Sequence, residues 1–284
     1  MLEEAVVEPN FYDQETIEEL STDLDVYSSI IADETQESLP ESSKITNNDS
    51  QATITKAAVP IASEDVLVFA CGDGFWNTIA RGKANKPEVI TLVGNYLRRA
   101  GNPNVAKNSD TVKSVKEGYS LLHALVAIKN TTALRKVIDA GARVDVYPLA
   151  STKEDQMTPL MLAVKTGYQS GVESLLKTGN CSLLLDRGPY GENALHAAIQ
   201  SNSDEMVIYV LKLTQQALLD KADDNGATPL HYACITGKTR LVSLLIKDCQ
   251  CQTDLKDNKG ETPLHYAVRN RKLKVITKMV GELG

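Results

Sequence analysis

Cysteine and histidine are the residues of this sequence whose chemistry could supply nucleophiles, general bases or metal ligands. Among five cysteines, Cys249 and Cys251 lie close together, while Cys71, Cys181 and Cys234 are distant along the chain. Two thiolates are at most half of a tetrahedral zinc site. We therefore predict no metal site, and the odd cysteine count argues against a disulfide scaffold and suits a reducing compartment.

Two short glycine-containing segments resemble ligand loops only in part. The segment Gly72-Asp73-Gly74 lacks the Gly-Lys-Ser/Thr ending of a phosphate loop. The segment 223–226 lacks the acidic residue that closes a calcium loop. These segments predict no cofactor.

The four histidines recur at one position of a repeated motif: His123, His196, His231 and His265. Thr228-Pro229-Leu230-His231-Tyr232-Ala233 returns 34 residues later, from Thr262 onward. Earlier copies begin at Asn193, Thr158 and Ser120, at intervals of 35, 35 and 38 residues. The longer interval predicts a loop insertion at residues 147–152. Five units of nearly constant length indicate a repeat protein.

Each unit predicts a pair of helices. The Thr, Ser or Asn supplies an N-cap acceptor, and the proline suits the first helical position. A second apolar helix follows, for example at residues 240–247 and 206–211. Gly141 and Gly101 suit left-handed caps, and Asp224-Asn225-Gly226 and Asn258-Lys259-Gly260 suit tight hairpin tips.

These residues resemble the ankyrin repeat family, through the Thr-Pro-Leu-His motifs, Gly141-Ala142-Arg143-Val144 and the Asp-Asn-x-Gly tips. The resemblance covers residues 118–284. A weaker unit at 73–105 has two helices without the motif, with Trp76 suited to shielding that end. The resemblance implies an all-α solenoid of about six helix-turn-helix repeats with β-hairpin tips. Its expected domain is 64–284, with an atypical first repeat (73–105) and clear repeats from 116 onward.

In that family the motif imidazole bridges neighbouring turns, so the resemblance leaves no histidine for catalysis. It also implies a partner-binding concave face of tips and first helices, built from positions that the fold leaves free. Those positions are Tyr119, Ala127, Ile128, Met157, Lys165, Thr166, Tyr190, Glu192, Gln200, Ser201, Asp224, Asn225, Ile235, Thr236, Asn258, Lys259 and Arg269. Tyr119, Ile128, Met157 and Tyr190 suit an apolar anchor. Lys259 and Arg269 suit an acidic partner patch.

Some residues depart from the family pattern. Met161 replaces the motif histidine, and Cys249 stands where the turn glycine is expected, so a strained or rearranged turn is predicted there. The last helix carries Val275, Ile276, Met279 and Val280. Three alternatives remain open for the outer face of this helix: it is exposed to solvent, a partner covers it, or further chain covers it. The basic cluster Arg269, Arg271, Lys272, Lys274 and Lys278 suits a solvated face, a nuclear-import patch or an acidic partner.

Charge divides the chain into an acidic head and a mildly basic body. Residues 1–60 hold 14 acidic and two basic residues, a net charge of −12, and the remainder carries +5. Residues 1–63 are expected to be mostly disordered. Within them, Ile17, Leu20, Leu24, Tyr27 and Ile31 follow helical spacing, which predicts an amphipathic helix at 16–31. Three alternatives remain open: the periodicity is accidental in a disordered tail, the segment folds on a partner, or the acidic head docks on the basic body.

We predict a non-enzymatic protein-protein interaction module. We expect it to bind neither a membrane nor nucleic acid directly, since the sequence has no apolar span and no strongly basic balance. A monomer in the cytoplasm, the nucleus or both is expected. One specific version resembles inhibitor-of-κB regulators of Rel-type transcription factors, although the head lacks the Asp-Ser-Gly degradation signal. Another is a targeting subunit for a separate kinase, phosphatase or ubiquitin ligase.

Overall fold

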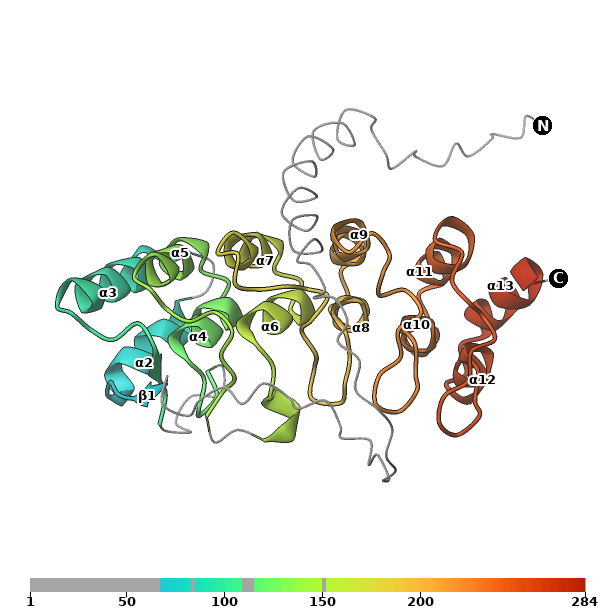
Figure 1. The fold of residues 1–284 in the computed structure, drawn as a ribbon, viewed down its shortest axis with the longest axis horizontal. Coiled ribbons are helices and arrows are strands. Elements are labelled where there is room, and N and C mark those ends of the chain that lie inside the picture. Colours follow the sequence, from blue (N-terminus) through green and yellow to red (C-terminus); the bar gives the residue numbers. More distant parts are fainter. Residues whose placement is uncertain (1–66, 83–84, 109–114, 150–151, 284) are drawn as a thin grey trace, which may run out of the picture. The chain divides into compact units, whose positions relative to one another are not determined.

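The computed structural model describes residues 67–82, 85–108, 115–149 and 152–283. Two layers of antiparallel helices run through these residues (Figure 1). The tail helix expected at 16–31, with Ile17, Leu20, Leu24, Tyr27 and Ile31, lies outside the described residues. The domain boundary at 63/64 also lies outside them and stays a prediction.

Six helix pairs follow one another within the described residues, and their bounds are as follows. They are α2 (Asp73–Arg81) with α3 (Pro87–Arg98), α4 (Leu121–Ala127) with α5 (Thr131–Asp139), α6 (Pro159–Lys165) with α7 (Gln169–Leu176), α8 (Ala194–Gln200) with α9 (Asp204–Leu213), α10 (Pro229–Thr236) with α11 (Thr239–Ser243) and its π-helical extension η2 (Leu244–Asp248), and α12 (Pro263–Arg269) with α13 (Leu273–Leu283). A 3-10 turn, η1 (Lys153–Asp155), precedes α6.

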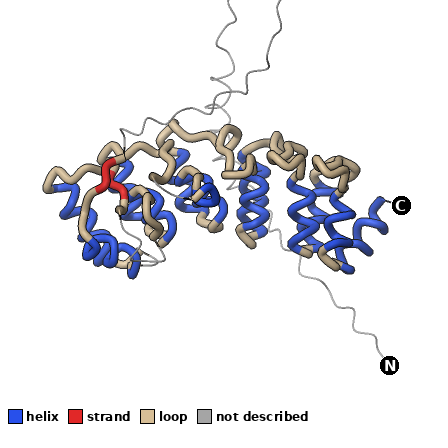
Figure 2. The backbone as a smooth tube through the Cα atoms, turned by 90° about the horizontal axis from the view of Figure 1, so that it is seen from below, coloured by secondary structure: helices blue, strands red, loops and turns tan. Residues whose placement is uncertain are grey.

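The inner helices α4, α6, α8, α10 and α12 pack in sequence order, each against the next. The outer helices α3, α5 and α7 do the same, as do α11 and α13. Figure 2 shows the connecting loops gathered along one side of the helices. One core of mostly aliphatic side chains runs from Trp76 to Met279. Each pair therefore buries its apolar residues chiefly against its neighbours, as stacked repeats do.

The inner helices begin as the motif predicts. Ser120 and Thr158 accept hydrogen bonds from the backbone amides of His123 and Met161. In α10 and α12 the cap is reciprocal, because the Thr228 and Thr262 amides also donate to Nδ1 of His231 and His265. Pro159, Pro229 and Pro263 follow these caps at the first helical turn. Local caps thus satisfy part of the N-terminal amides of these inner helices.

The first repeat carries a feature that the sequence pattern did not indicate. Strand β1 (Val68–Phe69) pairs in parallel with β2 (Val105–Ala106), with Val68 opposite Val105. Trp76 is fully buried here, and its indole N–H donates to the Ala70 carbonyl at 3.2 Å. The expected role of Trp76 in closing this end agrees with that burial.

The turn at Cys249 is rearranged, as the missing glycine predicted. The left-handed residue is Gln250 (φ 56°), eight residues after buried Val242, whereas Gly141 follows buried Leu134 by seven. Repeat five therefore contains one extra residue at this point. The helix absorbs it as η2, in which the Cys249 amide donates to the Leu244 carbonyl at 3.0 Å. A π-turn is the usual way for a helix to accommodate a single insertion.

Imidazoles join three pairs of successive repeats. Nε2 lies 2.9 Å from the Met157 carbonyl for His123, 2.9 Å from Ala227 for His196 and 3.1 Å from Glu261 for His231. Because a backbone amide donates to Nδ1 of His196 and of His231, the proton belongs on Nε2, which donates to the next repeat. Where Met161 replaces histidine, the Thr158 hydroxyl donates instead to Asp186 at 2.5 Å.

Removing a bridge should destabilise the protein only where the imidazole is enclosed. We expect His196→Ala to lower the free energy of unfolding by about 2–4 kcal/mol, because it leaves a buried amide and carbonyl without partners and opens a cavity. The matched change His265→Ala, at an exposed imidazole, should cost less than about 1 kcal/mol. Urea denaturation of both variants measures the difference, and equal losses would contradict the bridging role.

The bridges also predict how stability depends on pH. Burial lowers the pKa of His123 and of His196 to about 4, against 6.5 for an exposed histidine. Between pH 6.5 and 4 the unfolded chain binds protons that the folded chain does not, so stability falls as the pH falls. Each histidine contributes up to about 1.4 kcal/mol per pH unit in this window and nothing above it. Urea titrations at pH 7, 6 and 5 test this, and an undiminished slope in His196→Ala would disprove it.

Candidate functional site

The loops that precede the inner helices are organised by carboxylates. We call residues 188–192, 223–227 and 257–261 the tip loops. In the second, one Asp223 oxygen accepts the amides of Asn225 and Ala227, and the other accepts the Tyr232 hydroxyl at 2.9 Å. In the third, Asp257 does the same for Lys259, Glu261 and Tyr266. The local sequence thus fixes the shape of both tips.

Backbone hydrogen bonds connect these tips into a row. The Asp224 amide donates to the Tyr190 carbonyl at 3.0 Å, and the Asn258 amide to the Asn225 carbonyl at 2.9 Å. The Asn258 side chain also donates to the Asp224 carbonyl. Three successive repeats therefore present their tips in a fixed register, and a partner meets an already ordered surface.

Several predicted binding residues are exposed in this part of the molecule. We call them the candidate surface: Tyr190, Gln200, Asp224, Asn225, Ile235, Thr236, Asn258, Lys259 and Arg269. The predicted positions Ala127, Lys165, Thr166 and Ser201 are half-buried at the ends of earlier inner helices. The structure brings the exposed set together on repeats four to six. Their role in binding stays a prediction.

Aromatic rings hold two charged side chains in place: Arg269 of the candidate surface, and Lys153, which contacts Tyr190 of that surface. Arg269 lies over the Tyr266 ring at 4.5 Å and donates to Glu261 at 2.5 Å. Lys153 Nζ lies 4.8 Å from the centre of the Tyr190 ring. Such contacts restrict long side chains before binding, which lowers the entropy that an interface must offset.

The expected apolar anchor on the early repeats is wrong. Tyr119, Ile128 and Met157 are 2–5% exposed, and only Tyr190 of that group reaches solvent, at 37%. These three side chains belong to the main core. The insertion folds back onto the tip of repeat two, at Gly118, instead of projecting. The Leu149 amide donates to the Gly118 carbonyl at 2.9 Å, and Lys116 pairs with Asp155.

Gly118 permits that close approach. Its φ is +79°, and a Cβ there would overlap the Leu149 carbonyl oxygen. The Met157 carbonyl is also the acceptor of the His123 bridge.

The prediction that Glu192 is a free surface position is a further one that the structure corrects. Glu192 is 7% exposed, and its carboxylate accepts the Tyr190 amide at 2.9 Å. Tyr119, Met157 and Glu192 therefore serve the fold.

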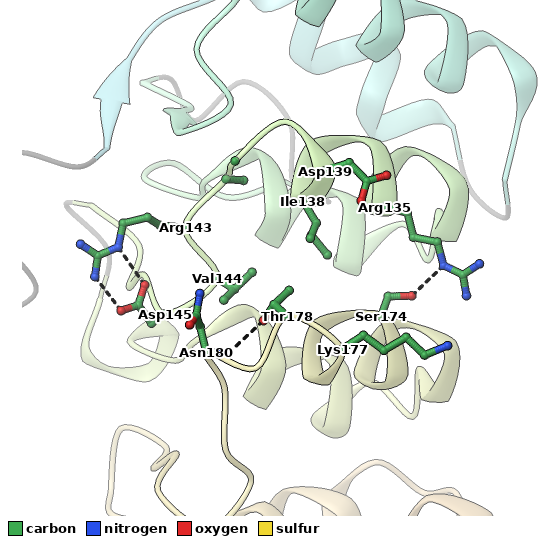
Figure 3. Close-up of a pocket in the computed structure, with 12 residues that line it drawn as sticks. Arg135, Ile138, Asp139, Arg143, Val144, Asp145, Ser174, Lys177, Thr178 and Asn180 are labelled. Carbon is green, nitrogen blue, oxygen red and sulfur yellow. Dashed lines mark hydrogen bonds and ion pairs between the residues drawn. The ribbon is translucent and has the colours of Figure 1, made fainter. Parts of the chain in front are cut away.

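A groove of about 990 Å³ lies between the ends of α5 and α7, and the sequence analysis did not indicate it (Figure 3). Arg135 crosses it to donate to Ser174 at 3.1 Å, and Arg143 pairs with Asp145 in a two-bond ion pair. These basic groups are already engaged within the molecule. Only the convergence of two outer-helix ends creates the groove, so no local sequence signal marks it.

Three thiols that could react chemically are held in the neutral form. Burial raises the pKa of Cys181, Cys234 and Cys251 to about 12, so these thiols stay protonated at neutral pH. Among the described residues, no group of three or more His, Cys, Asp or Glu side chains could hold a metal ion. In the same part of the chain, no helix is long and apolar enough to cross a membrane. The geometry suits recognition through a surface.

Sequence and structure comparisons agree with this architecture. A family model of ankyrin repeats (three copies) matches residues 122–218 and 214–284, more than half of the chain. The chain therefore belongs to the ankyrin repeat family. Its fold resembles the crystal structure of the ankyrin repeat domain of Bcl-3, described as a unique member of the IkappaB protein family. The TM-score is 0.55 at 22% identity, over 73% of this chain and 85% of that one.

Two curated relatives match over shorter stretches. NAD-dependent deacetylase sir2B of Dictyostelium discoideum is 25% identical over 188 residues, 58% of this chain and 24% of the relative. The nuclear factor NF-kappa-B p105 subunit of Rattus norvegicus is 28% identical over 133 residues, 46% of this chain and 14% of the relative. The chain thus spans a quarter or less of these relatives, whose activities belong to much longer proteins.

The burial pattern separates folding residues from surface residues. We expect Met157→Ala to destabilise the protein by about 2–4 kcal/mol, because it removes a buried side chain from the main core. Tyr190→Ala should cost less than about 1 kcal/mol, since the ring is partly exposed and loses little more than its contact with Lys153. Thermal or urea denaturation measures both, and a reversed order would contradict the assignment.

Proposed function

We propose that this chain is a non-enzymatic regulator that captures another protein on the candidate surface. The observation that carries the proposal is the hydrogen-bonded row of tips on repeats four to six. The row presents Tyr190, and the inner helices α10 and α12 that follow the tips present Ile235 and Arg269. Aromatic, aliphatic and arginine side chains are the types that dominate protein interfaces. The enclosed imidazoles and protonated thiols support a role without catalysis.

Within this class, we infer an inhibitor-of-κB-like regulator whose partner is a Rel-type transcription factor. Likeness to the p105 subunit and to the Bcl-3 ankyrin domain supports this version. The candidate surface mixes acidic and basic groups, among them Asp224, Lys259 and Arg269, and this mixture suits a partner with both charge signs. Such a regulator acts in the cytoplasm, the nucleus or both.

Binding to purified Rel-type DNA-binding domains tests this function. The full chain should bind them in isothermal titration calorimetry, and Ile235→Glu with Arg269→Glu should weaken binding at least tenfold, because both residues are exposed on the candidate surface. The matched control is Lys136→Glu with Lys177→Glu on the outer helix layer, which changes the net charge by more. It should leave affinity within about twofold.

Two results would count against the proposal. If no Rel-type domain binds the folded wild-type chain, the inhibitor-of-κB-like version is wrong. If the control and the candidate-surface variant lose affinity equally, the partner binds elsewhere. Circular dichroism of each variant confirms that a loss of binding does not come from unfolding.

A further inference from the structure

The last repeat exposes positions that the other motif repeats bury. The sixth residue after each motif cap is Val126, Val164, Ile199, Cys234 or Val268. The first four are at most 1% exposed, whereas Val268 is 56% exposed. Leu264 and His265 follow the same trend relative to Leu230 and His231. These exposed positions are the ones that a following repeat covers elsewhere in the molecule.

The outer helix of the last repeat shows the same pattern. Val275 and Met279 are fully buried against the preceding repeat, and Met279 Sδ lies 3.4 Å from the Cys234 thiol. Val280 is 57% exposed, whereas its counterpart Leu211 in α9 is 6% exposed. We call Leu264, His265, Val268, Ile276 and Val280 the stacking face. They come from both α12 and α13.

The stacking face also carries a hydrogen-bond donor. Nδ1 of His265 accepts the Thr262 amide at 3.1 Å, as Nδ1 of His231 accepts that of Thr228. The proton is therefore on Nε2, and in the other repeats this group donates to a carbonyl of the following repeat. Within the described residues no carbonyl accepts from Nε2 of His265. An occupant that offers one carbonyl oxygen would complete the bridge.

Charge along the last repeat is mostly positive, although Glu261 and Glu282 border it. Residues 262–281 contain five basic residues and no acidic residue. Arg271 stands at the register position of Lys129, whose ammonium reaches across to the Thr166 carbonyl of the next repeat at 2.8 Å. Arg271 is thus placed to reach an occupant of the stacking face. Lys274 is exposed on the same repeat.

We propose that the stacking face binds an acidic amphipathic helix of a partner protein, which packs there as a further repeat would. Helices cover the equivalent positions of the earlier repeats, so a helix fits the spacing of Leu264, Val268 and Val280. Acidic residues beside its apolar stripe match Arg271 and Lys274. This surface is distinct from the candidate surface and does not depend on the Rel-type assignment.

A pair of labelled peptides tests the proposal on the full chain. One 18-residue peptide carries leucine along one helical face and glutamate elsewhere, and its control carries lysine in place of glutamate. In fluorescence polarisation the acidic peptide should bind at least tenfold more tightly than the control. Val268→Asp should weaken that binding at least tenfold, because it places a charge within the apolar contact and repels the peptide.

Matched variants separate the charge contribution from the apolar one. Arg271→Glu with Lys274→Glu should weaken acidic-peptide binding at least tenfold, whereas Lys221→Glu with Lys256→Glu, on exposed loops of earlier repeats, should change it less than threefold. Equal affinity for the two peptides would overturn the proposal, as would binding that Val268→Asp leaves unchanged. Dimerisation in light scattering that Val268→Asp abolishes would assign the face to a second copy instead.

Discussion

The imidazole bridge between successive repeats is the interaction on which the arrangement of this molecule depends. Each bridge fixes an N-cap, a ring tautomer and the position of the next tip in one hydrogen-bonded path. The ring is enclosed by both repeats, which is why its pKa falls and why it stays neutral. A ring that must remain neutral and keep hydrogen bonds at both nitrogens has no capacity left for proton transfer. The constraint that builds the fold therefore occupies the bridging histidines His123, His196 and His231.

This constraint acts only between neighbours, and its consequences differ along the chain. Where Met161 interrupts the series, Thr158 and Asp186 supply a different polar link between the same two repeats. Where the second helix of repeat five has an extra residue, η2 absorbs it before the register of the next motif is affected. Local irregularities are corrected within one repeat, because each repeat needs to present only one tip and one apolar face to the next.

The sequence predicts the periodic part of the molecule well, since helix caps, apolar stripes and motif histidines depend on short spacings. It predicts less well the features that depend on distant contacts. The insertion was expected near residues 147–152, but its length alone did not indicate that the Leu149 amide would bond to the Gly118 carbonyl. The sequence also did not indicate that Tyr119 and Met157 would be buried in the main core. The pairing of Val68 with Val105 joins segments separated by two helices, and two-residue strands carry no clear periodic signal.

Burial then decides which side chains remain for recognition. Along the tips, Asp223, Asp257 and Glu192 resemble surface carboxylates in the sequence, yet their oxygens are used by backbone amides and tyrosine hydroxyls. Their neighbours Asp224 and Lys259 are exposed, and their side chains take no part in the hydrogen bonds described for the tips. Substitution at the first set alters the scaffold, whereas substitution at the second set changes only what the scaffold presents. This separation allows an ankyrin repeat chain to change its partner while keeping its fold.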